Sequence, residues 1–417
     1  MEEGDDTVAG TAPEAAIRAF YRRSPPSRLG VAVSGGSDSL ALLHLLHEAN
    51  VAPLSVVTVD HGLRPEAAGE ALHVARICEV LGLPHVVLEW EGWDGHGNLQ
   101  AEARRTRYAV IAEWAAGQGL DAVALGHTRD DQAETFLMRL AREAGVGGLA
   151  AMRDRFRRDG MEFHRPLLGV SRGSLRDWLG GRGARWIEDA SNADESFERV
   201  RVRKALEALS PLGVTPDALS TVAEQLRQAE EALSMAASDW ARHQISEDRG
   251  DLVIDRAGLL DLPRETGRRI LSDAVLWLSG AEYPPRRDSI SGLWPAIRGG
   301  IKTTLGGSVL LNTQETCRIT REHAAVAGLV TPTDALWDGR WRLSGPSEPG
   351  LEVRALGEAL SRCPDWRATG MPRPSLLASP AVWRGSELIA APVAGWPNGW
   401  TAEAVGRDTF TRFLLSR

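Results

Sequence analysis

The chain has 417 residues and a mass of 45.1 kDa, a length that predicts two or three domains. Its composition is 43% hydrophobic and 25% charged, which excludes wholesale disorder, and no apolar run approaches the roughly 18 residues that a membrane-spanning helix needs. The formal net charge of −8 excludes a uniformly basic nucleic-acid-binding protein but leaves room for a local basic patch.

The first third of the chain alternates apolar strands with segments of helical spacing. After a leader and a short helix over residues 13–23, we expect strands over residues 29–33, 54–59, 84–89 and 122–125. The helices between and after them are predicted over residues 39–49, 66–81, 99–118 and 130–142. This alternation predicts an α/β fold with a doubly wound parallel sheet, in which ligands bind beyond the carboxyl ends of the strands.

The rest of the chain is less regular. Helices are expected over residues 171–179 and 215–245, and short strands over 306–311 and 386–392. The predicted domains are a leader with one helix (1–25), an α/β catalytic domain (26–210), a mostly helical middle domain (211–330) and a small α+β C-terminal domain (331–417).

The strongest local signal is Ser-Gly-Gly-Ser-Asp-Ser, from Ser34 to Ser39, between a predicted strand and a predicted helix. Glycines let phosphate oxygens approach the backbone, and the free N–H groups at a helix start favour an anion. The string is not a Walker A loop, because GxxxxGK[ST] is absent. A tight turn with a capping serine is the alternative, but the complete string favours a phosphate-binding loop.

The end of the second predicted strand carries Val59, Asp60, His61 and Arg64. In a doubly wound sheet this end lies beside the first loop, so these residues are expected to face the same ligand. A solvated loop at a strand end is the alternative.

A predicted helix carries Arg104 and Arg107 three residues apart. Two arginines on one side of a helix can neutralise phosphates and a leaving pyrophosphate. The alternative is a solvated basic helix face.

The fourth predicted strand is followed by His127, Asp131 and Glu134, which are spaced so that they share one helix face. We expect Ala133, Phe136, Leu137 and Leu140 to be buried on the other face. The acids could simply complement the helix dipole. A metal site is a weaker alternative, because HExxH spacing is absent.

A basic stretch follows between residues 153 and 185, with nine arginines against four acids. In an otherwise acidic chain this stretch is a candidate for contacts with a nucleic-acid backbone. A solvated surface is the alternative.

The segments described so far resemble the PP-loop ATP pyrophosphatases of the N type, whose signature is SGGxDS. That family cleaves ATP between the α and β phosphates, adenylates an oxygen of its substrate and lets a nucleophile displace AMP. The resemblance implies an adenine nucleotide alpha hydrolase-like fold, with Asp38 holding Mg²⁺. The ATP-binding residues that it implies are Ser34, Gly35, Gly36, Ser37, Asp38, Ser39, Val59, Asp60, His61 and Arg64.

Within that group, the order of the four segments is similar to the tRNA(Ile)-lysidine synthetase family. Residues 145–152, 165–168 and 186–192 resemble its later motifs, and residues 283–287 and 303–307 resemble pieces of its C-terminal half. Val200 departs from the usual RNRVR, because this chain reads Arg-Val-Arg-Val-Arg there. Arg-Glu-Ala before Gly145 also replaces the commoner Arg-Gly-Ser.

This resemblance implies a ligase that uses ATP to adenylate the C2 oxygen of the wobble cytidine in an isoleucine tRNA with a CAU anticodon. The ε-amine of free L-lysine then attacks C2 and expels AMP, which gives lysidine and diphosphate overall. Asp38, Arg107 and His127 are then expected to be catalytic, and Asp131 and Glu134 to bind lysine. The expected tRNA-binding residues are Arg153, Arg155, Arg157, Arg158, Arg201 and Arg203, and the resemblance implies that the small C-terminal domain (331–417) also binds tRNA.

Three other functions stay open on the sequence. Synthetases that use ammonia share SGGxDS, but they usually carry a glutaminase domain, and none is apparent here. A tRNA thiolase would need a cysteine pair or cluster, whereas Cys78, Cys317 and Cys363 are scattered. An adenine-nucleotide-binding module without turnover is the non-enzymatic alternative.

The few cysteines and the acidic N-terminus, which has no apolar stretch, predict a reduced, cytoplasmic setting without a membrane partner. The sequence leaves a homodimer open.

Overall fold

The computed structural model describes residues 12–60, 67–89, 99–188, 194–281, 283–346, 348–405 and 408–416. The chain divides into two compact units, the first ending at Glu230 and the second beginning at Glu231. Among the described residues, no helix is long and apolar enough to cross a membrane. The finer four-part division made from the sequence stays a prediction.

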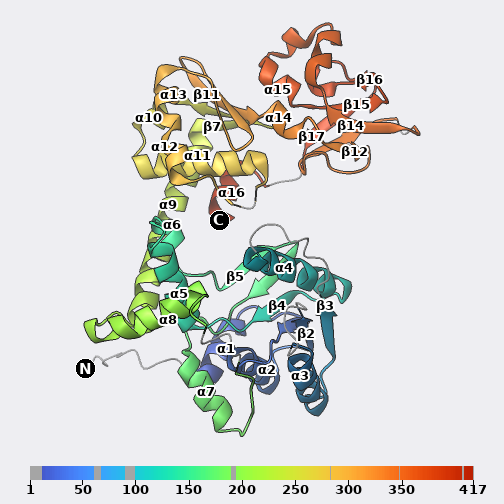
Figure 1. The fold of residues 1–417 in the computed structure, drawn as a ribbon. Helices are drawn as coiled ribbons and strands as arrows, with labels where there is room; N and C mark the ends of the chain where they lie inside the picture. The colour runs from blue at the N-terminus through green and yellow to red at the C-terminus, as the bar shows by residue number, and fades with distance from the viewer. Residues whose placement is uncertain are drawn as a thin grey trace. The chain divides into compact units, whose positions relative to one another are not determined.

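The first unit is built on a six-stranded sheet with the order β3-β2-β1-β4-β6-β5 (Figure 1). All pairs are parallel except β5 with β6, so the predicted doubly wound parallel sheet is confirmed and gains an antiparallel edge. The strand order reverses between β1 and β4, which is where such sheets bind ligands. The strands are β1 (Leu29–Ala32), β2 (Leu54–Asp60), β3 (His85–Glu89), β4 (Ala122–Leu125), β5 (Arg155–Arg158) and β6 (Met161–His164).

Helices cover both faces of this sheet, as Figure 1 shows. On one face Ile17, Leu42 and Val74 join a single apolar core, and on the other Tyr108 and Ile111 pack over the strands. Both central strands, β1 and β4, are buried along their whole length, which explains why they read as continuous apolar runs. The helices are α1 (Pro13–Tyr21), α2 (Ser37–Ala49), α3 (Ala67–Leu81), α4 (Leu99–Gly117) and α7 (Arg172–Gly180).

The edge hairpin β5–β6 was not predicted from the sequence. Its turn is made by Asp159 and Gly160, which both adopt positive φ angles, of 49° and 78°. An Asp-Gly pair with this backbone is the preferred two-residue hairpin turn. Part of the arginine-rich stretch is therefore an edge strand.

A small helical layer completes the first unit. It contains α5 (Arg129–Leu140), α6 (Val146–Leu149), α8 (Glu198–Leu209) and the start of the long α9 (Pro216–Gln244). Ala133 and Phe136 of α5 pack with residues of α8 and α9, and Leu137 packs against the same cluster. The expected burial of Leu140 is wrong, because this side chain lies near the end of α5 and is 49% exposed.

The second unit contains a five-stranded antiparallel sheet with the order β7-β8-β11-β10-β9, so residues 211–330 hold a sheet as well as helices. Its strands are β7 (Ile245–Asp248), β8 (Asp251–Asp255), β9 (Thr303–Leu305), β10 (Ser308–Asn312) and β11 (Thr316–Arg321). The sheet packs with α10 (Arg256–Asp261), α11 (Arg264–Ser279), α12 (Arg287–Ser291) and α13 (Leu293–Gly299). Phe410 and Leu414 of the last helix, α16 (Phe410–Ser416), join this core.

A separate apolar core is formed by residues between 326 and 402. In the sequence these residues lie between β11 and α16. Trp383 and Trp396 are partly buried and pack against it. The elements around it are α14 (His323–Val326), β12 (Val330–Pro332), β13 (Trp341–Ser344), β14 (Leu351–Ala355), α15 (Arg373–Leu377), β15 (Pro380–Arg384), β16 (Glu387–Ala390) and β17 (Thr401–Ala404).

Candidate active site

The serine- and glycine-rich loop joins β1 to α2 and is closed by its own hydroxyl groups. The Ser39 hydroxyl donates to the Gly36 carbonyl (3.0 Å) and accepts from the backbone N–H of Ser34 (3.1 Å). Gly35 has a φ of +85°, which a residue with a Cβ rarely adopts. The loop geometry therefore depends on the predicted glycine and serine.

The helix that follows this loop has no side-chain cap. Gly36 is the N-cap residue of α2, so the first backbone N–H groups of the helix are not satisfied by a side chain. An uncapped helix start at a strand end is suited to a phosphate group. Asp38 lies in this first turn and accepts a hydrogen bond from the Ser37 hydroxyl (3.0 Å).

Two distant segments contact the loop directly. A Cβ on Gly126, just after β4, would lie 3.0 Å from backbone atoms of Asp38 and Ser39, so the end of β4 touches the first turn of α2. The Ile187 N–H donates to the Gly35 carbonyl (3.0 Å). The structure thus brings the first, fourth and later predicted segments together.

Three carboxylates converge on the guanidinium of Arg172, the first residue of α7. Its Nε donates to Asp38 Oδ2 (3.0 Å), its Nη2 to Asp131 Oδ1 (3.2 Å) and its Nη1 to Glu134 Oε1 (3.3 Å). Arg203 also donates to Glu134 Oε1, at 2.6 Å. The acids come from two helices at the carboxyl ends of β1 and β4, so they form one acidic cluster at the switch point of the sheet.

Asp131 has two roles in the cluster. Its Oδ2 accepts from the backbone N–H and hydroxyl of Thr128, which makes a capping box at the start of α5. Its Oδ1 faces Arg172. Burial alone would raise the pKa of Asp131, but Arg172, His127 and the Thr128 bonds outweigh it and lower that pKa. The helix-start interpretation of this residue is confirmed, whereas its role in binding lysine stays a prediction.

The other members of the cluster are buried to different degrees. The side chain of Glu134 is only 1% exposed, and its Oε2 has no hydrogen-bond partner within the described parts of the chain. Burial raises the pKa of Asp38, and Arg172 offsets this only in part. Although burial lowers the pKa of Arg172, the three carboxylates raise it above its ordinary value, so this guanidinium stays charged.

A basic region lies beside the acidic cluster. Burial and the nearby guanidinium groups of Arg165, Arg107 and Arg104 lower the pKa of His127 to about 3, against the opposing charge of Asp131. His127 is therefore neutral at pH 7. It precedes the cap of α5 rather than lying on the helix, so the predicted shared helix face holds only for the two acids.

The second predicted segment is described in part. Val59 and Asp60 end β2, next to β1 in the sheet, and Val59 packs against the core on the α4 side. His61 and Arg64 lie outside the described residues.

The predicted tRNA-binding arginines do not form one uniform patch. Arg155 lies over the Phe20 ring (4.5 Å) and Arg158 over the Tyr108 ring (4.8 Å), whereas Arg153 and Arg157 are exposed. Arg203 lies at the acidic cluster. Arg201 is exposed and donates to the carbonyls of residues 195 and 196.

Sequence reasoning missed Arg172 as a member of the site. It was counted among the nine arginines of the basic stretch, yet its side chain faces three acids. The backbone N–H of Arg172 donates to Asp130 Oδ2 (2.7 Å), which holds the start of α7 against the start of α5. The spacing of residues along the chain carries no signal for this contact.

The carboxylates of the acidic cluster fit Mg²⁺ only in combination with a phosphate ligand. Among the described residues, no group of three or more His, Cys, Asp and Glu side chains could hold a metal ion. Magnesium commonly uses one or two carboxylates together with substrate phosphates. Asp38, beside the uncapped start of α2, supplies such a carboxylate.

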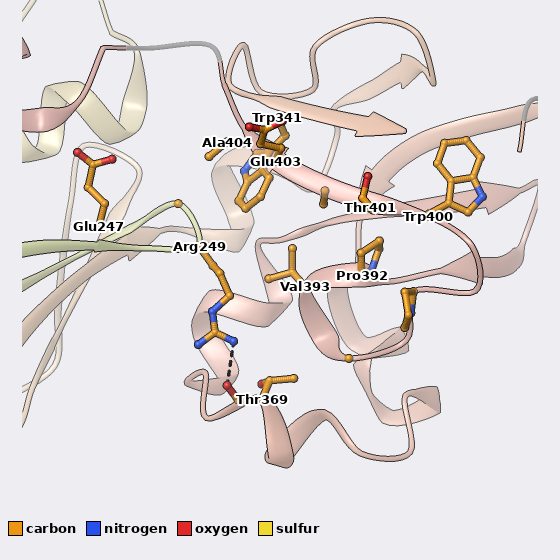
Figure 2. A pocket seen from close by; sticks show the side chains of 14 residues that line it. Glu247, Arg249, Trp341, Thr369, Pro392, Val393, Trp400, Thr401, Glu403 and Ala404 are labelled. Atoms are coloured by element: carbon orange, nitrogen blue, oxygen red, sulfur yellow. Dashed lines mark hydrogen bonds between the residues drawn. The ribbon is translucent and has the colours of Figure 1, made fainter. Parts of the chain in front are cut away.

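The second unit holds a cavity of about 600 Å³, seen in Figure 2. Its lining includes Trp341, Val393 and Trp400, and Arg249 donates to the Thr369 carbonyl at its edge (2.8 Å). It shares no residue with the acidic cluster and contains none of the residues predicted for chemistry.

Comparison with known proteins agrees with this geometry. A family model described as a PP-loop domain matches residues 11–209. A tRNA(Ile)-lysidine synthase of Ruegeria pomeroyi is 49% identical over 405 residues, which are 96% of this chain and 97% of that protein. The same enzyme of Wolbachia pipientis is 30% identical over 394 residues, 90% of this chain and 89% of that protein.

Solved structures show more distant similarity. A U34-tRNA thiolase of Methanococcus maripaludis aligns with 52% of this chain and 78% of its own, at 17% identity and a TM-score of 0.45. An ammonia-dependent NAD synthetase of Campylobacter jejuni aligns with 52% of this chain and 90% of its own, at 16% identity and a TM-score of 0.30.

Proposed function

Since the chain belongs to the tRNA(Ile)-lysidine synthase family, we propose that its acidic cluster and PP-loop carry out the two steps of lysidine formation. The chain is an ATP-dependent ligase that modifies tRNA(Ile). The substrate is the isoleucine tRNA with a CAU anticodon, and the product carries L-lysine at C2 of the wobble cytidine. The observation that carries the proposal is the meeting of Asp38, Asp131 and Glu134 on one guanidinium beside the PP-loop.

In the first step the cytidine C2 oxygen attacks the α-phosphorus of ATP, and the bond to the pyrophosphate breaks. The loop from Ser34 to Ser39 binds the phosphates with backbone N–H groups and hydroxyls. Asp38 would hold Mg²⁺, which neutralises phosphate charge when it is bound. Arg107, whose charge acts on His127 beside the cluster, stabilises the charge of the leaving pyrophosphate.

In the second step the ε-amine of lysine attacks C2, and the C2–O bond breaks so that AMP leaves with the oxygen. The lysine ammonium has an ordinary pKa of about 10.4 and must lose a proton before it attacks. We assign Asp131 and Glu134 to binding and orienting this ammonium, which lowers the barrier by fixing its position. Asp131 is a poor base because its pKa is lowered, so its first role is recognition, and the proton that the ammonium loses passes to water.

His127 acts as an uncharged hydrogen-bonding group. A neutral imidazole beside several guanidinium groups does not add to their positive charge. Its buried Nδ1 has no partner within the described residues, so it is available to a substrate group. We propose that His127 contacts the nucleotide or the reacting base.

The tRNA backbone is expected to contact the exposed arginines near the hairpin. Arg153 and Arg157 have the exposure that phosphate contacts require. Arg155 and Arg158 add charge, but they also pack on aromatic rings. Arg201 is also exposed, while Arg203 is assigned to the acidic cluster.

Sulfur transfer is disfavoured by the state of the cysteines. All three are free and buried. Burial raises the pKa of Cys78 to about 11 and that of Cys317 to about 12, and it also raises the pKa of Cys363. A thiolate is the reactive form of cysteine, so none of these side chains is suited to carry sulfur.

The test is product formation in complete and incomplete reactions. AMP and pyrophosphate are measured with ATP, Mg²⁺, lysine and the CAU tRNA transcript, and each component is omitted in turn. We expect pyrophosphate release to require ATP, Mg²⁺ and the tRNA, and AMP release to require lysine as well. Nucleotide binding without tRNA-dependent turnover would instead indicate a non-catalytic module.

The setting follows from the substrate. Because the enzyme acts on tRNA, we propose a cytoplasmic location. A homodimer remains a prediction.

A further inference from the structure

Arg172 is connected to every carboxylate of the acidic cluster. Each of its three guanidinium nitrogens donates to a different residue, at 3.0 Å to Asp38, 3.2 Å to Asp131 and 3.3 Å to Glu134. These are the oxygens assigned above to magnesium and to the lysine ammonium. Arg172 therefore competes with both cations for the same ligands.

Little of the cluster is open to lysine while Arg172 keeps these bonds. Asp131 Oδ2 is occupied by Thr128, so Oδ1, which Arg172 holds, is the oxygen left for a ligand. Glu134 Oε1 accepts from Arg172 and from Arg203. Glu134 Oε2 is buried and has no donor among the described residues, so it is an acceptor without a partner. A lysine ammonium needs more than this single oxygen to be held.

The backbone of Arg172 is fixed, whereas its side chain can be redirected. Its N–H donates to Asp130 Oδ2 (2.7 Å), and Ser171 caps the same helix by accepting from Ser174 N–H. The side chain of Arg172 is 19% exposed, and its guanidinium stands on a long, flexible stem. A change of rotamer can thus move the charge without moving α7.

ATP offers Arg172 an alternative partner to the carboxylates. Arg172 already bonds Asp38 in the first turn of α2, where the phosphates are proposed to bind. Arginine pairs with phosphate through two parallel hydrogen bonds, which are short and strong. Binding of the nucleotide therefore draws the guanidinium off the carboxylates that lysine uses.

We propose that Arg172 is a positioning residue that makes lysine binding depend on nucleotide binding, an inference that rests on the proposed function. Before ATP binds, the guanidinium blocks the ammonium site. After ATP binds, Arg172 contacts phosphate, and Asp131 and Glu134 accept the lysine ammonium. This order prevents lysine from occupying the site before the tRNA base can be adenylated.

The test is lysine binding measured by calorimetry, with and without Mg²⁺ and the non-hydrolysable analogue α,β-methylene-ATP. Couplings between two sites typically change affinity by about 5- to 150-fold, and wild-type protein is expected to bind lysine more tightly by such a factor with the analogue. In Arg172→Gln, lysine should bind more tightly without nucleotide than it does in the wild type. The ratio of the lysine affinity with the analogue to that without it should therefore fall toward 1.

Arg182→Gln is the matched control. Arg182 follows the same helix but pairs with Glu48 at the surface, so its variant should keep the wild-type factor. Arg172→Lys keeps the positive charge but loses the three guanidinium nitrogens that donate to separate carboxylates. Its ratio of lysine affinities should be intermediate. Thermal melting confirms that each variant is folded.

Three results would overturn the inference, and they bear on different parts of it. If Arg172→Gln keeps the wild-type ratio of lysine affinities, the role of Arg172 is contradicted. Weaker lysine binding by this variant in both conditions contradicts it as well. Neither result touches the proposed function. Failure of wild-type protein to bind lysine in either condition contradicts the lysine assignment, and the inference falls with it.

Discussion

Replacement of Glu134 by glutamine separates the two chemical steps. The change keeps the shape of the side chain and removes its charge at a position that is 1% exposed. Losing a charge-assisted hydrogen bond costs about 1.5–3 kcal/mol. This corresponds to roughly a 10- to 150-fold higher lysine concentration for half-maximal transfer. Adenylation should be spared, because the phosphates are proposed to bind at the loop after β1.

The assay traps the adenylated tRNA with α-labelled ATP and then adds lysine at increasing concentration. In Glu134→Gln the intermediate should accumulate when lysine is scarce and disappear at high lysine. Glu198→Gln is the control, because Glu198 pairs with Arg142 on the surface (2.6 Å). Complete loss of adenylation would mean that Glu134 serves ATP or magnesium. An unchanged lysine requirement would mean that the residue has only a structural role.

Three further changes test other parts of the site. Asp38→Asn should abolish AMP and pyrophosphate formation while its melting temperature stays near that of the wild type; near-normal turnover in a folded variant would remove Asp38 from the site. The double change Arg153→Gln with Arg157→Gln should flatten the salt dependence of tRNA binding and leave ATP affinity unchanged. The slope of log affinity against log salt concentration should fall by roughly 0.7–0.9 for each phosphate that is no longer neutralised. An unaltered slope would make these arginines an ordinary solvated surface. Gly126→Ala should destabilise the first unit by about 1–3 kcal/mol in denaturant unfolding and weaken ATP binding, because its Cβ would lie 3.0 Å from the backbone of Asp38; wild-type stability and binding would show that the end of β4 and the first turn of α2 can separate.

The sequence was informative where local rules decide structure. The alternation of apolar strands and helices predicted the parallel sheet, and the loop from Ser34 to Ser39 lies at its switch point, as expected. The edge hairpin was missed although Asp159-Gly160 is a strong turn signal, because arginine-rich strands lack an apolar pattern.

The acidic cluster shows what the sequence could not provide. Asp131 and Glu134 were predicted to share a helix face, and both do reach Arg172. The contact from Arg172 to Asp38, however, joins residues 134 positions apart. The docking of α7, by apolar packing and by the bond from Arg172 N–H to Asp130, places this arginine inward while others in the same stretch face solvent.

The most direct test of the account is nucleoside analysis of the CAU tRNA after reaction with ATP, Mg²⁺ and isotopically labelled L-lysine. Mass spectrometry of the digested tRNA should show cytidine replaced by a nucleoside that carries the lysine label, at up to one per tRNA. Omitting ATP, or replacing Asp38 with asparagine, should abolish it. ATP consumption that leaves the cytidine unlabelled would contradict lysine transfer and with it the function assigned to the acidic cluster.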